Sequence, residues 1–269
     1  MKAGERYKLK GPMAVKTGLL AFLLAGLLMM VEVWLSIVPL AGFLLTCLAA
    51  PFFPRIGFYA PVIYKGISGK KAVAITFDDG PDPLTTPLLL NFLETRGLKA
   101  TFFVIGENAA ANPGLIKKIV QQGHLLGNHS FKHSSRMFFK EIAAVVADIE
   151  ATQNVLNRCG VHTSAYRPPV GIVSPRLHPA LMRTGMVLIN FSCRPLDGGN
   201  RYLHNLSNRV LKRIQGDDIV LLHDKQPPDK KLISVWMKAI EEIVDGIEAR
   251  GMKVIPLSDL IGIPFMTRL

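Results

Sequence analysis

Apolar residues are distributed unevenly along this chain of 269 residues. Gly18 to Ala50 form an almost uninterrupted apolar tract of 33 residues, in which Glu32 is the only charge. From Lys71 onward, short apolar runs alternate with stretches whose apolar residues recur at helical spacing. The pattern therefore predicts an apolar N-terminal segment followed by a globular part of alternating strands and helices.

The apolar tract predicts a retained membrane segment. It exceeds the roughly 7–15 residues of a signal-peptide core, although small residues at Ala49 and Ala50 leave cleavage as an alternative. As a helix it would be about 50 Å long against a hydrocarbon core of about 30 Å, so one span leaves residues over and two are tight. Pro39 is the strong helix breaker, which predicts a span over 18–38 and a shorter leg over 40–53.

The composition divides the chain into four parts. Basic residues flank both ends of the apolar tract, so the positive-inside rule does not fix the orientation. A helical hairpin would leave the globular part in the cytoplasm, whereas a single span would place it outside. The parts are a basic tail over 1–16, a membrane segment of one span or a hairpin over 17–53, a linker over 54–70 and a globular domain over 71–269.

Strict alternation in the globular part favours parallel strands joined by crossover helices, and seven strands suit a distorted (β/α) barrel. The sequence has no G-x-G-x-x-G or Walker A motif that would favour a nucleotide-binding sheet. Glycines that end several helices fit the role of C-caps. Strands are predicted over 72–77, 100–105, 124–128, 164–167, 187–191, 218–223 and 252–255, and helices near 85–96, 113–122, 139–158, 175–184, 202–214 and 231–249.

Residues 51–269 are basic, with 27 Lys and Arg against 18 Asp and Glu. The net charge of +9 indicates an anionic binding partner, such as lipid headgroups or a phosphate-bearing substrate. No nucleic-acid-binding motif is present and the basic residues are scattered, which argues against a nucleic-acid partner. Cys47, Cys159 and Cys193 show neither paired nor metal-binding spacing.

Two adjacent carboxylates, Asp78 and Asp79, follow the first predicted strand of the domain. Side chains alternate along a strand, so at least one carboxylate must point inward and needs compensation by a metal ion or a basic group. A solvent-exposed Asp-Asp-Gly-Pro turn is the alternative. In a (β/α) barrel, reactive residues gather at the carboxyl ends of strands, and other candidates follow the same rule: His129 and His133, Arg167, Asp197 and His223.

The candidates divide into two sets by chemistry. His129 and His133 are four apart, so they can face one way on a helical turn and bind a metal together with an Asp. Such a site leaves open positions for water and a substrate oxygen. Arg167-Pro168-Pro169 fixes the backbone directly after a strand and directs a guanidinium to the rim. An Asp beside His223 would raise the pKa of the imidazole and make it a proton donor.

Four ordered motifs resemble the polysaccharide deacetylases of carbohydrate esterase family 4, the NodB homology domain. The motifs are Thr76-Phe77-Asp78-Asp79-Gly80, His129-Ser130-x-x-His133, Arg167-Pro168-Pro169 and Leu221-Leu222-His223. The resemblance runs from about Lys71 to Pro256. It implies a distorted (β/α) barrel, a divalent metal that is zinc or cobalt, an N-acetylated glycan or glycoconjugate substrate and a domain outside the cytoplasm.

The resemblance also implies a role for each site residue. Asp78 resembles the general base, and Asp79, His129 and His133 resemble the metal ligands. Arg167 resembles the residue that orients the base, and His223, paired with Asp197, resembles the acid that protonates the leaving amine. Leu221 resembles the apolar wall for the acyl methyl, and the backbone N–H of Val170 the oxyanion donor.

The chain departs from the family pattern at the sugar-binding groove. Arg194 and Gly198 stand where an acid and a Trp are usual, and Val170 replaces an aromatic residue, so two stacking surfaces are missing. The prediction is a membrane-attached, metal-dependent N-deacetylase of amino-sugar glycans. The alternative enzyme is a deacetylase or deformylase of a lipid-linked anionic amino sugar at the membrane surface.

Two other classes of protein are less consistent with the sequence. An iron oxygenase also uses two His and one carboxylate, but it needs neither a second acid beside the ligand nor a His at the opposite rim. An inactive glycan-binding module would be expected to keep its stacking aromatic residues and lose reactive ones, which is the reverse of what this sequence shows.

Overall fold

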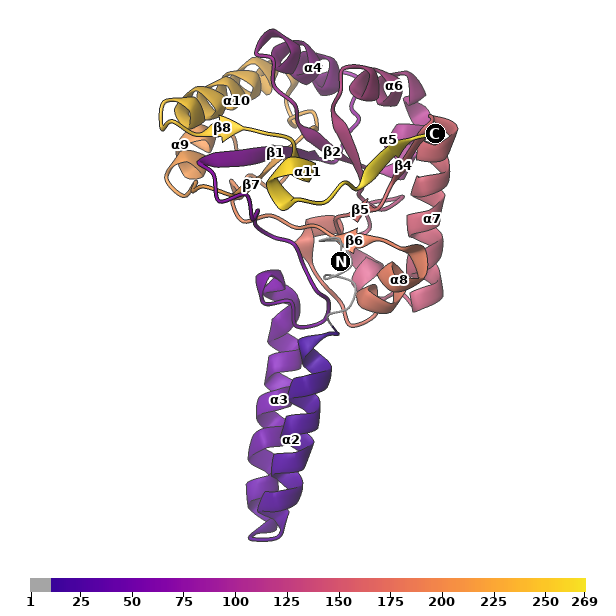
Figure 1. Ribbon diagram of the computed structural model, residues 1–269, viewed down its shortest axis with the longest axis vertical. Helices are drawn as coiled ribbons and strands as arrows, with labels where there is room; N and C mark the ends of the chain where they lie inside the picture. Colours follow the sequence, from indigo (N-terminus) through magenta and orange to yellow (C-terminus); the bar gives the residue numbers. More distant parts are fainter. Residues whose placement is uncertain (1–10) are drawn as a thin grey trace.

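The computed structural model describes residues 11–269; residues 1–10, most of the predicted basic tail, lie outside the described residues. Figure 1 shows two parts: a globular domain, and a helical hairpin that projects from it on the side of α8 (Leu177–Thr184) and β6 (Val187–Leu188). The hairpin consists of α2 (Met13–Met29) and α3 (Ile37–Ala49), with the 3-10 turn η1 (Val33–Ser36) leading into α3. The apolar tract therefore folds back on itself.

The chain reverses at Met30–Glu32, so the predicted break at Pro39 is wrong. Pro39 lies in the first turn of α3, where a backbone N–H has no intrahelical acceptor, so the helix tolerates proline there. Gly18 allows the two helices to approach, because a Cβ at this position would lie 3.0 Å from the Phe43 ring. Ala21 and Ala25 continue this small, buried face of α2.

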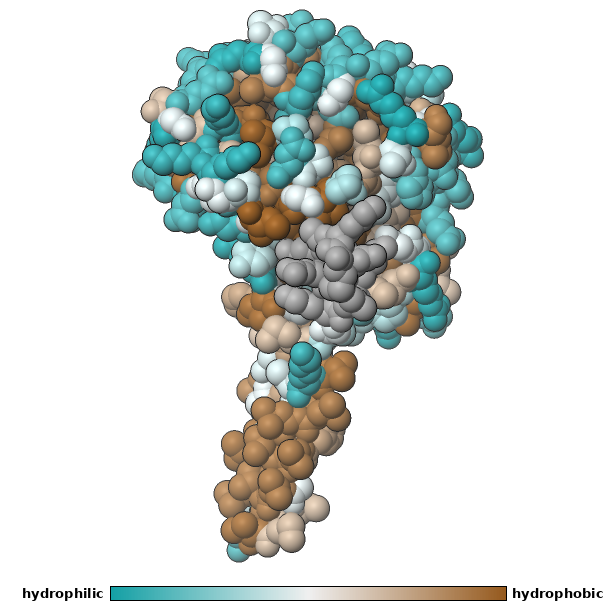
Figure 2. Space-filling model, in the orientation of Figure 1, coloured by the Kyte–Doolittle hydropathy of each residue, from teal (hydrophilic) through white to brown (hydrophobic). Residues whose placement is uncertain are grey.

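The outer surface of the hairpin is almost entirely apolar (Figure 2). Within residues 11–269, the stretch Val33–Phe52 is the one helical segment long and apolar enough to cross a membrane by length and composition. Met13–Met29 is a shorter apolar helix. Between the hairpin and the domain, two 3-10 turns, η2 (Ala50–Phe52) and η3 (Pro54–Ile56), lead the chain into the domain.

The domain is built on a curled parallel sheet with the strand order β6-β5-β3-β2-β1-β7, and β8 pairs with the first residues of β1. After β6, the chain makes a single parallel bridge from Cys193 to Val220 of β7, which brings the two edges of the curl together. This arrangement confirms the predicted distorted barrel. The strands are β1 (Ala72–Asp78), β2 (Thr101–Val104), β3 (Leu125–Asn128), β5 (Ala165–Tyr166), β6 (Val187–Leu188), β7 (Ile219–His223) and β8 (Lys253–Val254).

The predicted crossover helices cover the outside of the sheet (Figure 1), and the glycines expected to end them have positive φ. The predicted helix over 202–214 is shorter, because residues before it form a loop beside the strand ends. Elements not predicted are α5, α11 and an antiparallel pair, β4 (Val161–Thr163) with β9 (Met266–Arg268). The helices are α4 (Thr85–Thr95), α5 (Gly106–Ala111), α6 (Pro113–Gln121), α7 (Ile142–Arg158), α8 (Leu177–Thr184), α9 (Leu206–Leu211), α10 (Ile233–Glu248) and α11 (Leu257–Ile261), with 3-10 turns η4 (Ser135–Phe139), η5 (Pro169–Gly171) and η6 (Lys230–Leu232).

Alternation along β1 divides its side chains between two cores. Val73, Ile75 and Phe77 pack in the core that contains α4 and α10. Ala72 and Ala74 belong to the second core, together with residues of β6, β7 and α11. Thr76 and Asp78 continue this second row, so the period of the strand directs the Asp78 carboxylate inward.

Gly127 of β3 makes space for an aromatic residue beneath the strand ends. A Cβ at this position would overlap the ring of Phe103, which is fully buried. The same ring supports the Arg167 guanidinium, whose central carbon lies 3.9 Å from the ring centroid. The glycine therefore contributes to the placement of a predicted site residue.

Replacement of Gly127 by Ala is expected to lower the free energy of unfolding by about 1–3 kcal/mol, because overpacking forces Phe103 to move. The matched control is Gly114→Ala in α6, where no atom lies within 4 Å of the added Cβ. Removing glycine there is expected to change stability by less than about 1 kcal/mol. Chemical denaturation of the full chain in mild detergent measures both variants, and equal effects would contradict this packing.

Candidate active site

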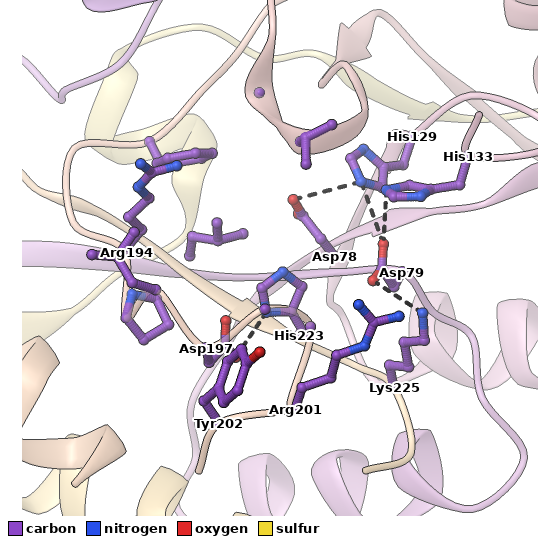
Figure 3. A pocket seen from close by; sticks show the side chains of 18 residues that line it. Asp78, Asp79, His129, His133, Arg194, Asp197, Arg201, Tyr202, His223 and Lys225 are labelled. Atoms are coloured by element: carbon purple, nitrogen blue, oxygen red, sulfur yellow. Dashed lines mark hydrogen bonds and ion pairs between the residues drawn. The ribbon is translucent and has the colours of Figure 1, made fainter. Parts of the chain in front are cut away.

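A cavity of about 640 Å³ opens at the carboxyl ends of the strands (Figure 3). The predicted site residues come from β1 and the residue that follows it, from β7, and from the loops that follow β3, β5 and β6. Arg167 lies behind the wall, against Asp78. The structure thus brings the whole predicted set together. The predicted residues that line the cavity are Asp78, Asp79, His129, His133, Val170, Asp197, Leu221 and His223.

Both adjacent carboxylates are buried, with Asp78 4% and Asp79 6% exposed, which excludes the turn with both acids in water. Asp78 is the last residue of β1. Asp79 lies beyond the strand with φ +75°, a left-handed conformation that is uncommon outside glycine. This turn, rather than strand alternation alone, carries the Asp79 carboxylate to the metal-ligand candidates.

Arg167 compensates Asp78. Its Nη1 donates to Asp78 Oδ1 at 2.7 Å and to Thr76 Oγ1 at 2.7 Å. The carbonyls of Ile189 and Asn190 accept from Nε and Nη2. Full burial lowers the pKa of Arg167, and the charge of Asp78 opposes that shift. The pairing engages Oδ1 of Asp78, and its Oδ2 lies 3.7 Å from His129 Nε2.

Asp79, His129 and His133 form a group suited to a metal ion. One candidate ligand atom from each residue lies within 4.8 Å of the other two. Asp79 Oδ1 lies 3.2 Å from His133 Nε2 and 3.6 Å from His129 Nε2. Two ligands of a tetrahedral zinc ion, each about 2.1 Å from it, are roughly 3.4 Å apart. Asp79 Oδ1 is also buried without a hydrogen-bond partner among the described residues, as expected of an atom reserved for a cation.

The two imidazoles are positioned by a loop and not by the helical turn expected from their spacing. Positive φ values at Ser130 and His133 fold the chain back after β3, so the ring centroids lie 4.9 Å apart. His129 Nδ1 lies 2.8 Å from the carbonyl oxygen of Arg167, which can only accept. This tautomer leaves the Nε2 lone pair of His129 free for a metal ion.

Charges within the group oppose the effect of burial. Burial raises the pKa of Asp79, but the His129 imidazole, whose Nε2 lies 3.6 Å from Oδ1, outweighs burial and holds that pKa well below the usual range. Burial lowers the pKa of His129, but Asp78 and Asp79 outweigh it, so the net shift is upward. The pKa of His133 is lowered by burial and by the nearby His129 charge. The group therefore combines an ionised carboxylate with two imidazoles.

His223 and Asp197 form a second pair on the other side of the cavity (Figure 3), with Nδ1 and Oδ2 2.9 Å apart. Burial alone would lower the pKa of His223, but the hydrogen bond and charge of Asp197 raise it above its ordinary value. Asn200 fixes the loop by donating to the carbonyls of His223 and Lys225. The pair can therefore hold a proton at the cavity wall.

Comparisons with known proteins agree with these motifs. The family model described as polysaccharide deacetylase matches residues 65–189. A chitooligosaccharide deacetylase from Bradyrhizobium sp. (strain ANU 289) is 31% identical over 207 residues, which cover 73% of this chain and 94% of the relative. The chain belongs to the polysaccharide deacetylase family. Within this family, a crystal structure of a peptidoglycan N-acetylglucosamine deacetylase has a TM-score of 0.68 and 28% identity, covering 76% of this chain and 94% of that one.

The polysaccharide deacetylase fold alone does not establish activity. A CE4 family pseudoenzyme from Bacillus anthracis has a TM-score of 0.66 and 24% identity, covering 74% of this chain and 68% of that one. Moreover, the matched family segment ends at 189, before Asp197, Leu221 and His223. Whether this member of the polysaccharide deacetylase family is active therefore depends on its own reactive residues.

Several cavity residues were not anticipated from the sequence. Tyr202 stands beside Gly198, where an added Cβ would lie 3.1 Å from its ring, so the residue that replaces the usual Trp makes space for another aromatic side chain. Phe191 also lines the cavity, together with two cations, Arg201 and Lys225; a third cation, Arg194, was expected at the sugar-binding groove. Tyr202 lies four residues beyond Gly198, outside any fixed motif spacing, and this is why motif reading missed it.

Replacing Asp79 by Ala is expected to weaken zinc binding by more than the roughly 10–100-fold typical of outer-shell changes, because it removes a ligand oxygen. Asp78→Asn is the matched control and is expected to retain zinc, since it lies outside the three-residue group. Zinc content after dialysis against a graded zinc buffer measures both. Equal zinc retention in Asp79→Ala and the unmodified chain would exclude Asp79 as a ligand.

Proposed function

We propose that this chain is a divalent-metal-dependent N-deacetylase of N-acetylated amino-sugar glycans, held at a membrane by the α2–α3 hairpin. One observation carries the proposal: the arginine-held carboxylate of Asp78 and the His223–Asp197 pair face the same cavity, beside three residues suited to a metal ion. The names of the relatives, a chitooligosaccharide deacetylase and a peptidoglycan N-acetylglucosamine deacetylase, support the substrate class.

Asp79, His129 and His133 would hold the metal, and their nitrogen and oxygen donors suit zinc or cobalt. Such an ion supplies Lewis acidity at the amide carbonyl and makes a nearby water more acidic. Asp78 takes the proton of the attacking water. Because Arg167 engages Oδ1, the free Oδ2 is the atom that accepts this proton.

His223 completes the reaction at the opposite wall. Water adds to the acyl carbon, the C–N bond breaks, and the departing amine nitrogen takes a proton from His223 to leave as a neutral amine. Asp197, which accepts from Nδ1, keeps the other ring nitrogen available and stabilises the protonated imidazole. The products are acetate and a free amino sugar.

Two further residues would position the acyl group. Leu221, 6% exposed on the cavity wall, would receive the acetyl methyl. Val170 lies in the turn after Arg167-Pro168-Pro169 with φ +56°, and its backbone N–H would donate to the developing oxyanion. Tyr202, exposed at the cavity edge, offers a surface for stacking a sugar ring.

The hairpin supports membrane attachment because its outward-facing side chains are apolar along both helices. Burying such a surface in lipid is favourable at about 25 cal/mol per Å² of apolar area. If both helices cross the bilayer, the N-terminal tail and the catalytic domain lie on the same side. We therefore keep the four-part organisation as part of the proposal, with the membrane segment anchoring a deacetylase domain over 71–269.

The direct test is acetate release by the purified full chain. The zinc- or cobalt-loaded protein is expected to release acetate from chitooligosaccharides or N-acetylated peptidoglycan fragments. Chelation should abolish release and metal addition restore it. Absence of acetate with the whole panel, in protein shown to contain metal, would overturn the proposed reaction.

Asp78→Asn is expected to lower kcat by about 10²–10⁴-fold, because an amide cannot take the proton of water. Zinc content should stay unchanged, so the loss cannot be attributed to the metal site. Steady-state acetate release together with metal analysis checks both points. An unchanged kcat would remove Asp78 from the mechanism.

Asp197→Asn is expected to move the alkaline fall of kcat/KM to lower pH. The folded pKa of His223 is raised by Asp197, and the acid must be protonated to act, so losing that carboxylate means that the proton is lost at lower pH. The pH dependence of kcat/KM for both proteins measures this shift. A shift to higher pH, or none, would contradict the assigned pairing.

A further inference from the structure

A second cavity, of about 540 Å³, adjoins the active-site cavity. Arg194 and Leu196 line both cavities, so the two are neighbours along the loop that follows β6. Four of its lining residues are cations, Arg55, Lys65, Arg194 and Arg213, and we call this space the cation cavity. The mechanism above makes no use of it.

The charge of the cation cavity is largely uncompensated. Its one acid, Asp218, is 4% exposed and already accepts hydrogen bonds from Ser192 Oγ and the Gln215 backbone N–H, each at 2.7 Å. Lys65 Nζ lies 3.9 Å from the same carboxylate. Arg194 and Arg213 make no side-chain hydrogen bond or ion pair with any residue in the described range 11–269, and the Arg194 guanidinium lies 5.9 Å from the centroid of the Phe191 ring. Two guanidinium groups are therefore free to bind an anion.

Arg55 links this cavity to the hairpin. It lies in η3, three residues after Phe52, the end of the stretch long enough to cross a membrane. Its guanidinium donates to the backbone carbonyl of Ser192, which orients the side chain and leaves its charge unneutralised. The cation cavity thus has the apolar hairpin on one side and the active-site cavity on the other.

We infer that the cation cavity binds the phosphate or diphosphate of a lipid-linked amino sugar whose N-acetyl group lies at Asp78. Guanidinium groups match phosphate oxygens in pairs, and several cations facing one acid suit a ligand with more than one negative charge. The adjacent hairpin favours a phosphate carried on a lipid over one on a soluble sugar. This inference rests on the proposed function, because it names the substrate of the same site.

The test compares three probes with the same N-acetylated disaccharide: one neutral, one with a 1-phosphate, and one joined through diphosphate to a long-chain alcohol. The full metal-loaded chain in detergent micelles is expected to deacetylate the lipid-linked probe with the highest kcat/KM, at least about tenfold above the neutral sugar. Equal values for the two phosphorylated probes would assign the site to soluble sugar phosphates and overturn the lipid-linked assignment.

The double variant Arg55→Gln, Arg213→Gln tests the site itself, because both residues line only the cation cavity. It is expected to raise KM for the lipid-linked probe at least about tenfold and to leave kcat/KM for the neutral disaccharide unchanged. Arg183→Gln, an exposed cation at the end of α8, is the matched control. A phosphate preference that survives the double variant would overturn the inference.

A binding measurement separates this inference from the proposed reaction. Radiolabelled inorganic diphosphate, titrated into the chelated full chain, is expected to bind the unmodified protein and the Arg183 variant, and to bind the double variant at least about tenfold more weakly. Chelation excludes binding through a metal ion. If no probe is deacetylated but this difference persists, the proposed reaction fails and the anion site stands; if diphosphate binds all three proteins equally or none, the anion site fails.

Discussion

The buried ion pair between Arg167 and Asp78 organises this domain. A fully buried guanidinium is tolerated only where its donors are satisfied, and here Asp78, Thr76 and two backbone carbonyls accept from it. These acceptors belong to β1 and to the chain just after β6. The pair therefore joins elements across the interior of the curled sheet. The two edges are also connected by the bridge from Cys193 to Val220, and through the segment 63–65, which bridges to Ile189 on one side and to Asp218 on the other.

The same pair determines which atoms remain for chemistry. With Oδ1 of Asp78 held by Arg167, the carboxylate has one fixed orientation, and its second oxygen lies near His129. The carbonyl of Arg167 also accepts from His129 Nδ1, which sets the tautomer of a metal-ligand candidate. One arginine thus orients both the proposed base and the proposed metal site. Loss of either partner would leave an uncompensated charge, at a cost of about 3–5 kcal/mol in buried pairs.

The sequence predicted the barrel and the reactive residues because both follow local rules. Alternating apolar runs and helical stretches specify parallel strands, and residues at strand ends meet at one rim. The hairpin turn at Met30–Glu32 was missed because Pro39 was expected to interrupt the helix. Proline breaks a helix only in its interior, and the sequence does not show that Pro39 lies in the first turn of α3. Tyr202 was missed because it reaches the cavity through a loop with positive φ at Gly198, Gly199 and Asn200, which no periodicity describes.

A sugar-binding groove with few aromatic surfaces is explained if the substrate and the enzyme lie in the same membrane. Tyr202 is 64% exposed, so stacking at the cavity edge can supply only part of the binding energy. An enzyme and a lipid-linked substrate held in the same bilayer have a high effective concentration, so the site requires less affinity for the sugar itself. If the cation cavity binds the phosphate of such a substrate, a phosphate near Arg194 would then position the acetamido group by a charge contact. Replacement of an acid by Arg194 is consistent with that arrangement, because an acid there would repel the phosphate.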